Sequence, residues 1–192
     1  MSAIAELRTA TWPSHQRLEK RIGFKARLET VGSYRTHIER MWGFHVALEP
    51  RLMSGVLSDW LTDSEARRKI PLLERDLMAL GAERSGVALL PRCQSVPVCD
   101  DPASAFGCAY VLEGATLGGR SLMPLVETRL GLTPERGAAY LASYGDAVEE
   151  RWRSFGKALD RCCAEDPQRA RAADAAAATF AALELWLCGD PA

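Results

Sequence analysis

The chain lacks the features that mark nucleic-acid-binding, secreted and membrane-spanning proteins. Its 24 basic and 25 acidic residues leave a net charge of −1, so no basic surface for nucleic acid or an anionic membrane is expected. The opening MSAIAELRTATWPSHQ holds no apolar run of secretory-leader length. The most apolar segment, residues 175–188, is interrupted by Glu184 and is shorter than the roughly 20 residues needed to cross a bilayer. We therefore expect a cytoplasmic protein with no nucleic-acid partner and no membrane contact.

Common metal and dinucleotide motifs are also missing. The six cysteines form no C-x-x-C pair, which predicts reduced thiols in a chain without a secretory leader. None of the three histidines follows a glutamate in the E-x-x-H spacing of helical di-iron carboxylate proteins, so that class is disfavoured. No glycine-rich dinucleotide motif follows a strand, and the chain is therefore not expected to bind NAD(P)H or flavin itself.

The sequence predicts a single all-α domain over residues 1–192. No alternating run of β-branched residues is long enough for a strand, whereas apolar residues recur at three and four positions and Ala, Leu, Arg and Glu dominate. No linker, repeat or low-complexity tract divides the chain. The predicted helices span residues 2–22, 31–50, 64–81, 103–130, 134–144, 146–164 and 167–188. Loops are expected at residues 29–33, 81–86, 91–102 and 131–134.

The stretch EGATLGGR, residues 113–120, places three glycines inside one predicted helix. Glycine costs a helix interior about 0.8–1 kcal/mol relative to alanine, so Gly114, Gly118 and Gly119 together cost on the order of 3 kcal/mol. Another interaction must offset this cost.

A helical wheel gathers four residues within about 60° of one another: Gly107, Val111, Gly114 and Gly118. Glu113 and Arg120 lie on the opposite side of the same helix. A face stripped nearly to backbone admits either another helix or a planar ligand close to the main chain. A turn or break at Gly118–Gly119 is a third interpretation, and it is compatible with both others.

His15 and Glu19 are four residues apart, which sets both side chains on one helix face. A carboxylate that accepts the Nδ1 proton fixes the imidazole tautomer and leaves Nε2 free for a metal. A plain surface pair has the same spacing, so both interpretations stay open. Pro13 fits a first helical turn, with Thr11 or Ser14 as its cap.

The two other histidines, His37 and His45, lie eight residues apart on a predicted helix that also carries Trp42. We interpret both as core or partly exposed side chains. Both are less well supported as functional residues than His15.

Two motifs together resemble the biliverdin-producing heme oxygenases: LRTATWPSHQRLE at residues 7–19 and YVLEGATLGGR at residues 110–120. The second motif is most similar to the bacterial group associated with bacteriophytochromes. WRSF at 152–155 and TFAALELWL at 179–187 resemble later helices of the same family, so the resemblance spans most of the chain. The order and separation of the motifs make it specific.

The resemblance implies that heme, both substrate and cofactor, lies between the first helix and the glycine-bearing helix. His15 would be the proximal iron ligand, and Glu19 its hydrogen-bond partner. Gly114, Ala115 and Gly118 would form the catalytic wall, where bare backbone leaves bound O₂ little room except toward the macrocycle edge. A neutral imidazole and a distal side without a proton-donating side chain favour hydroxylation of the heme itself. Further implied heme contacts are Thr11 and Val111.

One position departs from the family pattern. Animal members carry an aspartate directly after the first glycine of the second motif, and this chain has Ala115. Water held by main-chain carbonyls, or a polar group from another helix, must then organise the distal side.

The resemblance also implies which cations hold the heme propionates. Arg8 precedes His15 by seven residues, about 10 Å along a continuous helix. Arg153 and Lys157 resemble basic positions that relatives use for the same purpose, and each of the three is equally interpretable as a solvated surface charge. Propionate anchoring decides which meso edge faces O₂, so the cleavage position is not predicted.

We therefore expect a heme oxygenase that opens heme to biliverdin, carbon monoxide and ferrous iron with O₂ and electrons from an external ferredoxin or reductase. A bacteriophytochrome is one candidate receiver of the biliverdin, and iron release from scavenged heme is equally compatible. Two alternatives stay open. One is a non-degrading heme-binding or heme-sensing protein of the same fold, and the other is a helical interaction domain whose glycine face packs on a partner helix.

Overall fold

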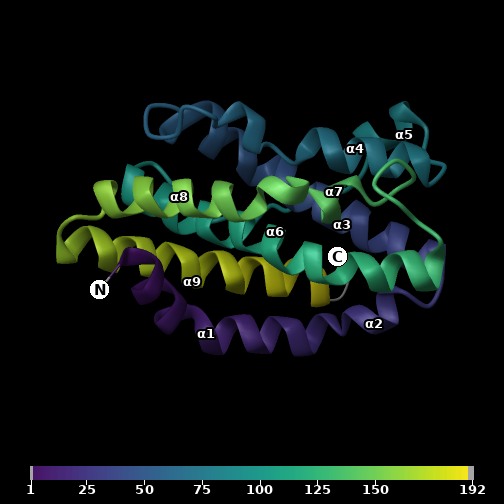
Figure 1. Cartoon of the computed structure of the whole chain (residues 1–192), viewed down its shortest axis with the longest axis horizontal. Coiled ribbons are helices and arrows are strands. Elements are labelled where there is room, and N and C mark those ends of the chain that lie inside the picture. Colours follow the sequence, from purple (N-terminus) through teal and green to yellow (C-terminus); the bar gives the residue numbers. More distant parts are fainter. Residues whose placement is uncertain (1, 190–192) are drawn as a thin grey trace.

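Helices form nearly all the regular structure of the computed structural model, which describes residues 2–189 (Figure 1). In order they are α1 Ala3–Ile22, α2 Phe24–Arg27, α3 Val31–Arg51, α4 Ile70–Ala79, α5 Arg84–Ala88, α6 Pro102–Leu130, α7 Ala139–Ala142, α8 Val148–Cys162 and α9 Asp166–Cys188. A π-helical turn at Leu52–Val56 and 3₁₀ turns at Glu65–Arg67 and Gly145–Ala147 complete the elements. No strand occurs between residues 2 and 189, so the all-α prediction is confirmed. In the same range, none of the helices combines the length and hydrophobicity that a membrane span requires.

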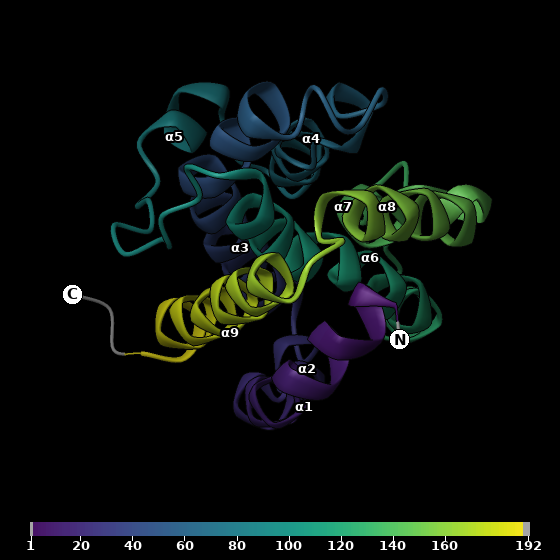
Figure 2. The same ribbon diagram turned by 90° about the vertical axis from the view of Figure 1, so that its left-hand side faces the viewer.

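The bundle is organised around α9, which packs along both α1 and α6 (Figures 1 and 2). The helices α7 and α8 pack on α6, and α4 packs on α3. Apolar side chains from these elements form one core, in which the rings of Phe106 and Phe155 are buried with centroids 5.5 Å apart. Both α1 and α6 pack on α9, and the cavity described below lies between them.

The first helix begins ten residues before Pro13 and continues through it. Ser2 is the N-cap, and its side chain accepts a hydrogen bond from the Ala5 amide. The prediction that Thr11 or Ser14 caps a helix starting at Pro13 is therefore wrong, and the Thr11 hydroxyl instead donates to the Leu7 carbonyl at 2.7 Å. Proline removes one helical hydrogen bond, and packing of α1 on α9 holds the helix through that gap.

The helix predicted at 64–81 is shorter in the structure. A 3₁₀ turn ends at Arg68, whose ψ of 135° is extended, and α4 begins only at Ile70. Pro71 lies in the first turn of α4, where its missing amide costs no helical hydrogen bond. Residues 84–88, predicted to be partly loop, form the short helix α5.

Most of the helix predicted at 134–144 is a turn. The amides of Arg136 and Ala138 both donate to the Thr133 carbonyl, at 2.8 and 3.1 Å. Gly137 has a φ of +89°, which a right-handed helix does not allow. Only Ala139–Ala142 is helical, as α7.

Candidate functional site

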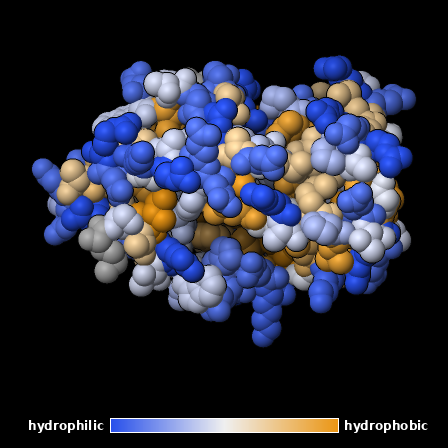
Figure 3. Space-filling model, viewed as in Figure 1, coloured by the Kyte–Doolittle hydropathy of each residue, from blue (hydrophilic) through white to orange (hydrophobic). Residues whose placement is uncertain are grey.

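A cavity of about 690 Å³ lies between α1 and α6, with side chains of α9 also lining it. Its walls are mainly apolar, and in the space-filling view apolar side chains occupy a recess above the lower edge, where Figure 1 places α1 (Figure 3). The volume is within the roughly 300–1,000 Å³ typical of small-molecule sites. Eight of the predicted site residues line this cavity: Arg8, Thr11, His15, Glu19, Val111, Gly114, Ala115 and Gly118.

His15 is held on the α1 wall by two aromatic rings. Trp12 stacks on the imidazole with centroids 5.7 Å apart, and Phe180 of α9 meets it edge-on at 5.7 Å. The His15 Nδ1 atom is buried without a hydrogen-bond partner and lies 3.6 Å from the Glu19 carboxylate. This is too long for a good hydrogen bond but close enough for the carboxylate to favour a proton on Nδ1. The nitrogen left available to a ligand is then Nε2.

The glycines of α6 divide into two pairs with different neighbours. A Cβ at Gly107 would lie 2.1 Å from the Ala172 carbonyl oxygen of α9, and one at Gly119 would lie 2.7 Å from the Leu141 carbonyl oxygen of α7. At Gly114 the nearest atom is 3.9 Å away, on Trp152, and at Gly118 nothing lies within 4 Å. The glycines therefore serve close helix packing at one pair and leave open space at the other. The third interpretation, a break at Gly118–Gly119, is wrong because α6 runs unbroken to Leu130.

Alanine at these positions is expected to change stability in opposite directions. Gly107→Ala forces the backbones of α6 and α9 apart and should lower the free energy of unfolding by about 1–3 kcal/mol. Gly118→Ala meets open space and gains helix propensity, so it should raise stability by up to about 1 kcal/mol. Urea unfolding followed by circular dichroism measures both. Equal effects at the two sites would contradict this division of the glycines.

Two predicted cations do not line the cavity. Arg153 and Lys157 are exposed on α8, one residue beyond Trp152 and Gly156. Trp152 lines the cavity, and a Cβ added at Gly156 would lie 2.7 Å from the Ile4 side chain of α1. One residue along a helix turns the side chain by about 100°, which directs both cations away from these contacts. Their contact with propionates stays a prediction.

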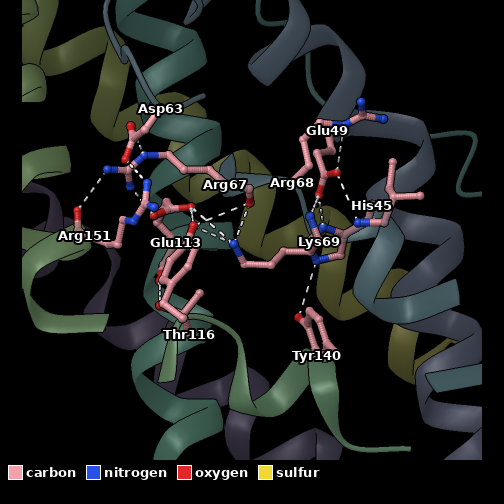
Figure 4. A network of polar contacts seen from close by, with 12 residues as sticks. His45, Glu49, Asp63, Arg67, Arg68, Lys69, Glu113, Thr116, Tyr140 and Arg151 are labelled. Carbon is pink, nitrogen blue, oxygen red and sulfur yellow. Dashed lines mark hydrogen bonds and ion pairs between the residues drawn. The ribbon is translucent and has the colours of Figure 1, made fainter. Parts of the chain in front are cut away.

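Tyr140 also lines the cavity, which the sequence did not reveal. Its buried hydroxyl lies 3.4 Å from His45 Nε2, and His45 Nδ1 lies 2.9 Å from the Glu49 carboxylate (Figure 4). Burial raises the pKa of Glu49, but hydrogen bonds from His45 and from the amides of Lys69 and Ile70 outweigh it, and the net pKa is lowered. With Glu49 ionised, His45 donates a hydrogen bond from Nδ1, and its Nε2 is the acceptor for the Tyr140 hydroxyl. His45 is thus a core residue, as predicted, that also supports a cavity side chain.

A buried ionic cluster occupies the other side of α6 (Figure 4). Arg67, 1% exposed, donates to Glu113 at 2.6 Å and to Asp63 at 2.8 Å. The Tyr144 hydroxyl donates to Glu113 at 2.7 Å, and Lys69 Nζ lies 3.8 Å from the same carboxylate. Burial lowers the pKa of Lys69 to about 8, against the opposing effect of the nearby carboxylates. Glu113 therefore points away from the cavity, as the helical wheel predicts, and ties α6 to the segment before α4.

His37 is buried, as predicted, but it also lines the cavity from α3. Its ring meets Phe24 edge-on, with centroids 5.4 Å apart. Burial, with a smaller contribution from Arg27, lowers the pKa of His37 to about 4. The cavity thus contains a second imidazole besides that of His15. Its low pKa keeps the His37 ring neutral at neutral pH.

Comparison with known proteins agrees with this arrangement. Residues 1–187 match the family model described as heme oxygenase. A protein named heme oxygenase from Xanthomonas campestris pv. campestris (strain 8004) is 30% identical over 159 residues, which cover 81% of this chain and 87% of that protein. The NO- and CO-bound heme oxygenase from Neisseria meningitidis has a TM-score of 0.83 at 21% identity, covering 97% of this chain and 90% of that one. The heme oxygenase from Leptospira interrogans has a TM-score of 0.77 at 16% identity, covering 98% and 99%.

At those identities the two structures show the fold alone. The family model, however, covers nearly the whole sequence, and the Xanthomonas relative matches most of it. The chain therefore belongs to the heme oxygenase family.

Proposed function

We propose that the protein opens heme to biliverdin and releases carbon monoxide and ferrous iron, with O₂ as co-substrate. The observation that carries the proposal is a mainly apolar cavity with the His15 imidazole on the α1 wall and two uncovered glycines on the α6 wall. A disc-shaped tetrapyrrole fits between two such walls. The family binds heme as its substrate.

On the proximal side, His15 Nε2 is the proposed iron ligand. Glu19 keeps the proton on Nδ1, and Trp12 and Phe180 fix the ring plane. Within residues 2–189 no three His, Cys, Asp or Glu side chains gather as a metal site. A single imidazole suits an iron whose other ligands belong to the porphyrin.

On the distal side, Gly114, Ala115 and Gly118 present backbone and one methyl group to the substrate. They leave space over the macrocycle without offering a carboxylate. We propose the Tyr140 hydroxyl, held by His45, as the group from another helix that positions water there. A hydrogen bond from this hydroxyl would orient the water, which the methyl side chain of Ala115 cannot do.

Arg8 is the proposed anchor for the propionates. It is exposed, lines the cavity, and forms no ion pair with any residue between 2 and 189, so its charge is available to a carboxylate. Thr11 and Val111 contact the disc in this arrangement, and Arg153 and Lys157 remain candidates for a second propionate contact.

Electrons must come from a separate ferredoxin or reductase in this proposal. The likeness of the second motif to the bacteriophytochrome-associated group supports a bacteriophytochrome as receiver of the biliverdin. Iron supply from scavenged heme fits the same chemistry.

The test is a single-turnover reaction of the full chain loaded with hemin. With O₂ and a reductant, the Soret band is expected to give way to the absorption of biliverdin, and carbon monoxide is expected in the headspace. Reduction followed by a return to ferric heme without biliverdin would favour the alternative left open by Ala115, a heme-binding or heme-sensing protein of the same fold. A Soret band that stays the same as that of free hemin would exclude both.

A further inference from the structure

His37 is an unpartnered polar side chain in an otherwise apolar end of the cavity. It is 7% exposed, and within residues 2–189 its ring makes no hydrogen bond to protein. Phe24, whose ring meets His37 edge-on, also lines the cavity, as does Met41 one turn further along α3, and Arg27 is the charged group that acts on the imidazole. Its ring nitrogens are not among the fully enclosed polar atoms without a partner, so they are open to a hydrogen bond from a ligand or from solvent in the cavity.

The position of His37 along the cavity decides which part of a ligand it meets. Arg8 and Ile22 lie seven residues to either side of His15 on α1, about 10 Å in each direction. Phe24, which contacts His37, follows directly beyond the Ile22 end (Figure 1). A tetrapyrrole with its iron at His15 and its propionates at Arg8 therefore turns its opposite edge toward His37.

Closed heme has no hydrogen-bonding group at that edge, where it carries only methyl, vinyl and meso C–H groups. A linear tetrapyrrole opened there has a lactam at each cut end, with a carbonyl acceptor and an N–H donor. A neutral imidazole also has one donor and one acceptor. Because burial keeps the pKa of His37 near 4, the ring retains both at neutral pH.

We propose that His37 recognises the product: its imidazole hydrogen-bonds a lactam of biliverdin opened at the meso carbon opposite the propionates. This inference rests on the function proposed above and adds a preference among ligands. His37 is unpartnered against closed heme and partnered against the opened product, so the cavity holds that product more tightly than an apolar residue would allow.

The test measures direct binding of ferric heme and of purified biliverdin isomers to the full chain by absorbance titration. In His37→Leu, the affinity for biliverdin opened opposite the propionates should fall about 3- to 10-fold, as expected for one buried hydrogen bond. The affinity for heme, and for an isomer opened at another meso carbon, should change less than about twofold. His37→Gln, which keeps a donor and an acceptor, should restore most of the lost affinity.

Met41→Leu is the matched control, because Met41 is one turn along the same wall and the exchange is apolar. Because it alters no hydrogen-bonding group, any effect it has should be the same for heme and for both isomers. The proposal is overturned if His37→Leu weakens heme and both isomers equally, or if it leaves the first isomer unaffected. Since biliverdin is added directly, either result is obtained whether or not the chain degrades heme.

Discussion

Replacing His15 with alanine is expected to stop heme degradation almost completely. The cavity is apolar enough to retain hemin in the variant, but no other histidine on α1 replaces the iron ligand. Turnover should fall at least about 100-fold, because losing the proposed iron ligand should cost more than the roughly 10- to 100-fold typical of losing a residue that only orients a metal ligand. Single-turnover biliverdin formation and the Soret spectrum of the loaded protein measure the loss.

Two further measurements separate ligation from a folding defect. Free imidazole should return much of the original spectrum to His15→Ala, because the truncated side chain leaves a space of matching shape. His37→Leu should keep the iron-coordination spectrum of the unchanged protein, although it also removes a cavity imidazole. A wild-type spectrum in His15→Ala would place the iron on another residue and refute the proposed site.

The largest loss of stability is expected from Arg67→Met. This change leaves Glu113 buried without its main counter-charge and also removes the contact to Asp63. Breaking a buried ion pair from one side costs about 3–5 kcal/mol, because the remaining charge stays desolvated. Urea unfolding should therefore show a midpoint well below that of the unchanged protein.

Matched variants test whether burial is the cause. Arg120→Met removes an exposed arginine that lies 3.6 Å from Glu149, and it should cost less than about 1 kcal/mol. Adding Glu113→Gln to Arg67→Met removes the stranded charge and should recover part of the loss. A double variant less stable than Arg67→Met would show that the unpaired carboxylate is not the source of the cost.

The fold was predictable from sequence where periodicity is long and uninterrupted. The helices carrying His15 and the glycines were located to within a residue or two, since apolar residues recur at helical spacing along both and loops were recognised at residues 91–102 and 131–134. The segments around α4 and α7 were predicted too long. At Gly137 a positive φ ends the helical pattern, and composition alone does not show that conformation.

The cavity residues were predictable only where a motif named them. His15, Gly114 and Gly118 were predicted from the two motifs at residues 7–19 and 110–120. Tyr140 belongs to neither motif and lies on a four-residue helix that reaches the cavity through tertiary packing. His37 was predicted as core, which is correct for its burial and incomplete for its role. Helical spacing cannot distinguish a face that meets other side chains from one that borders a cavity.

The part of α6 that lines the cavity at Gly114 and Gly118 has few side chains that could fix its position. Gly114 and Gly118 offer no anchoring atoms, so the height of α6 above a bound disc is determined elsewhere: by the tight crossings at Gly107 and Gly119 and by the salt bridges behind Glu113. The packing of these residues against α7, α9 and the segment before α4 thus sets the width of the slot.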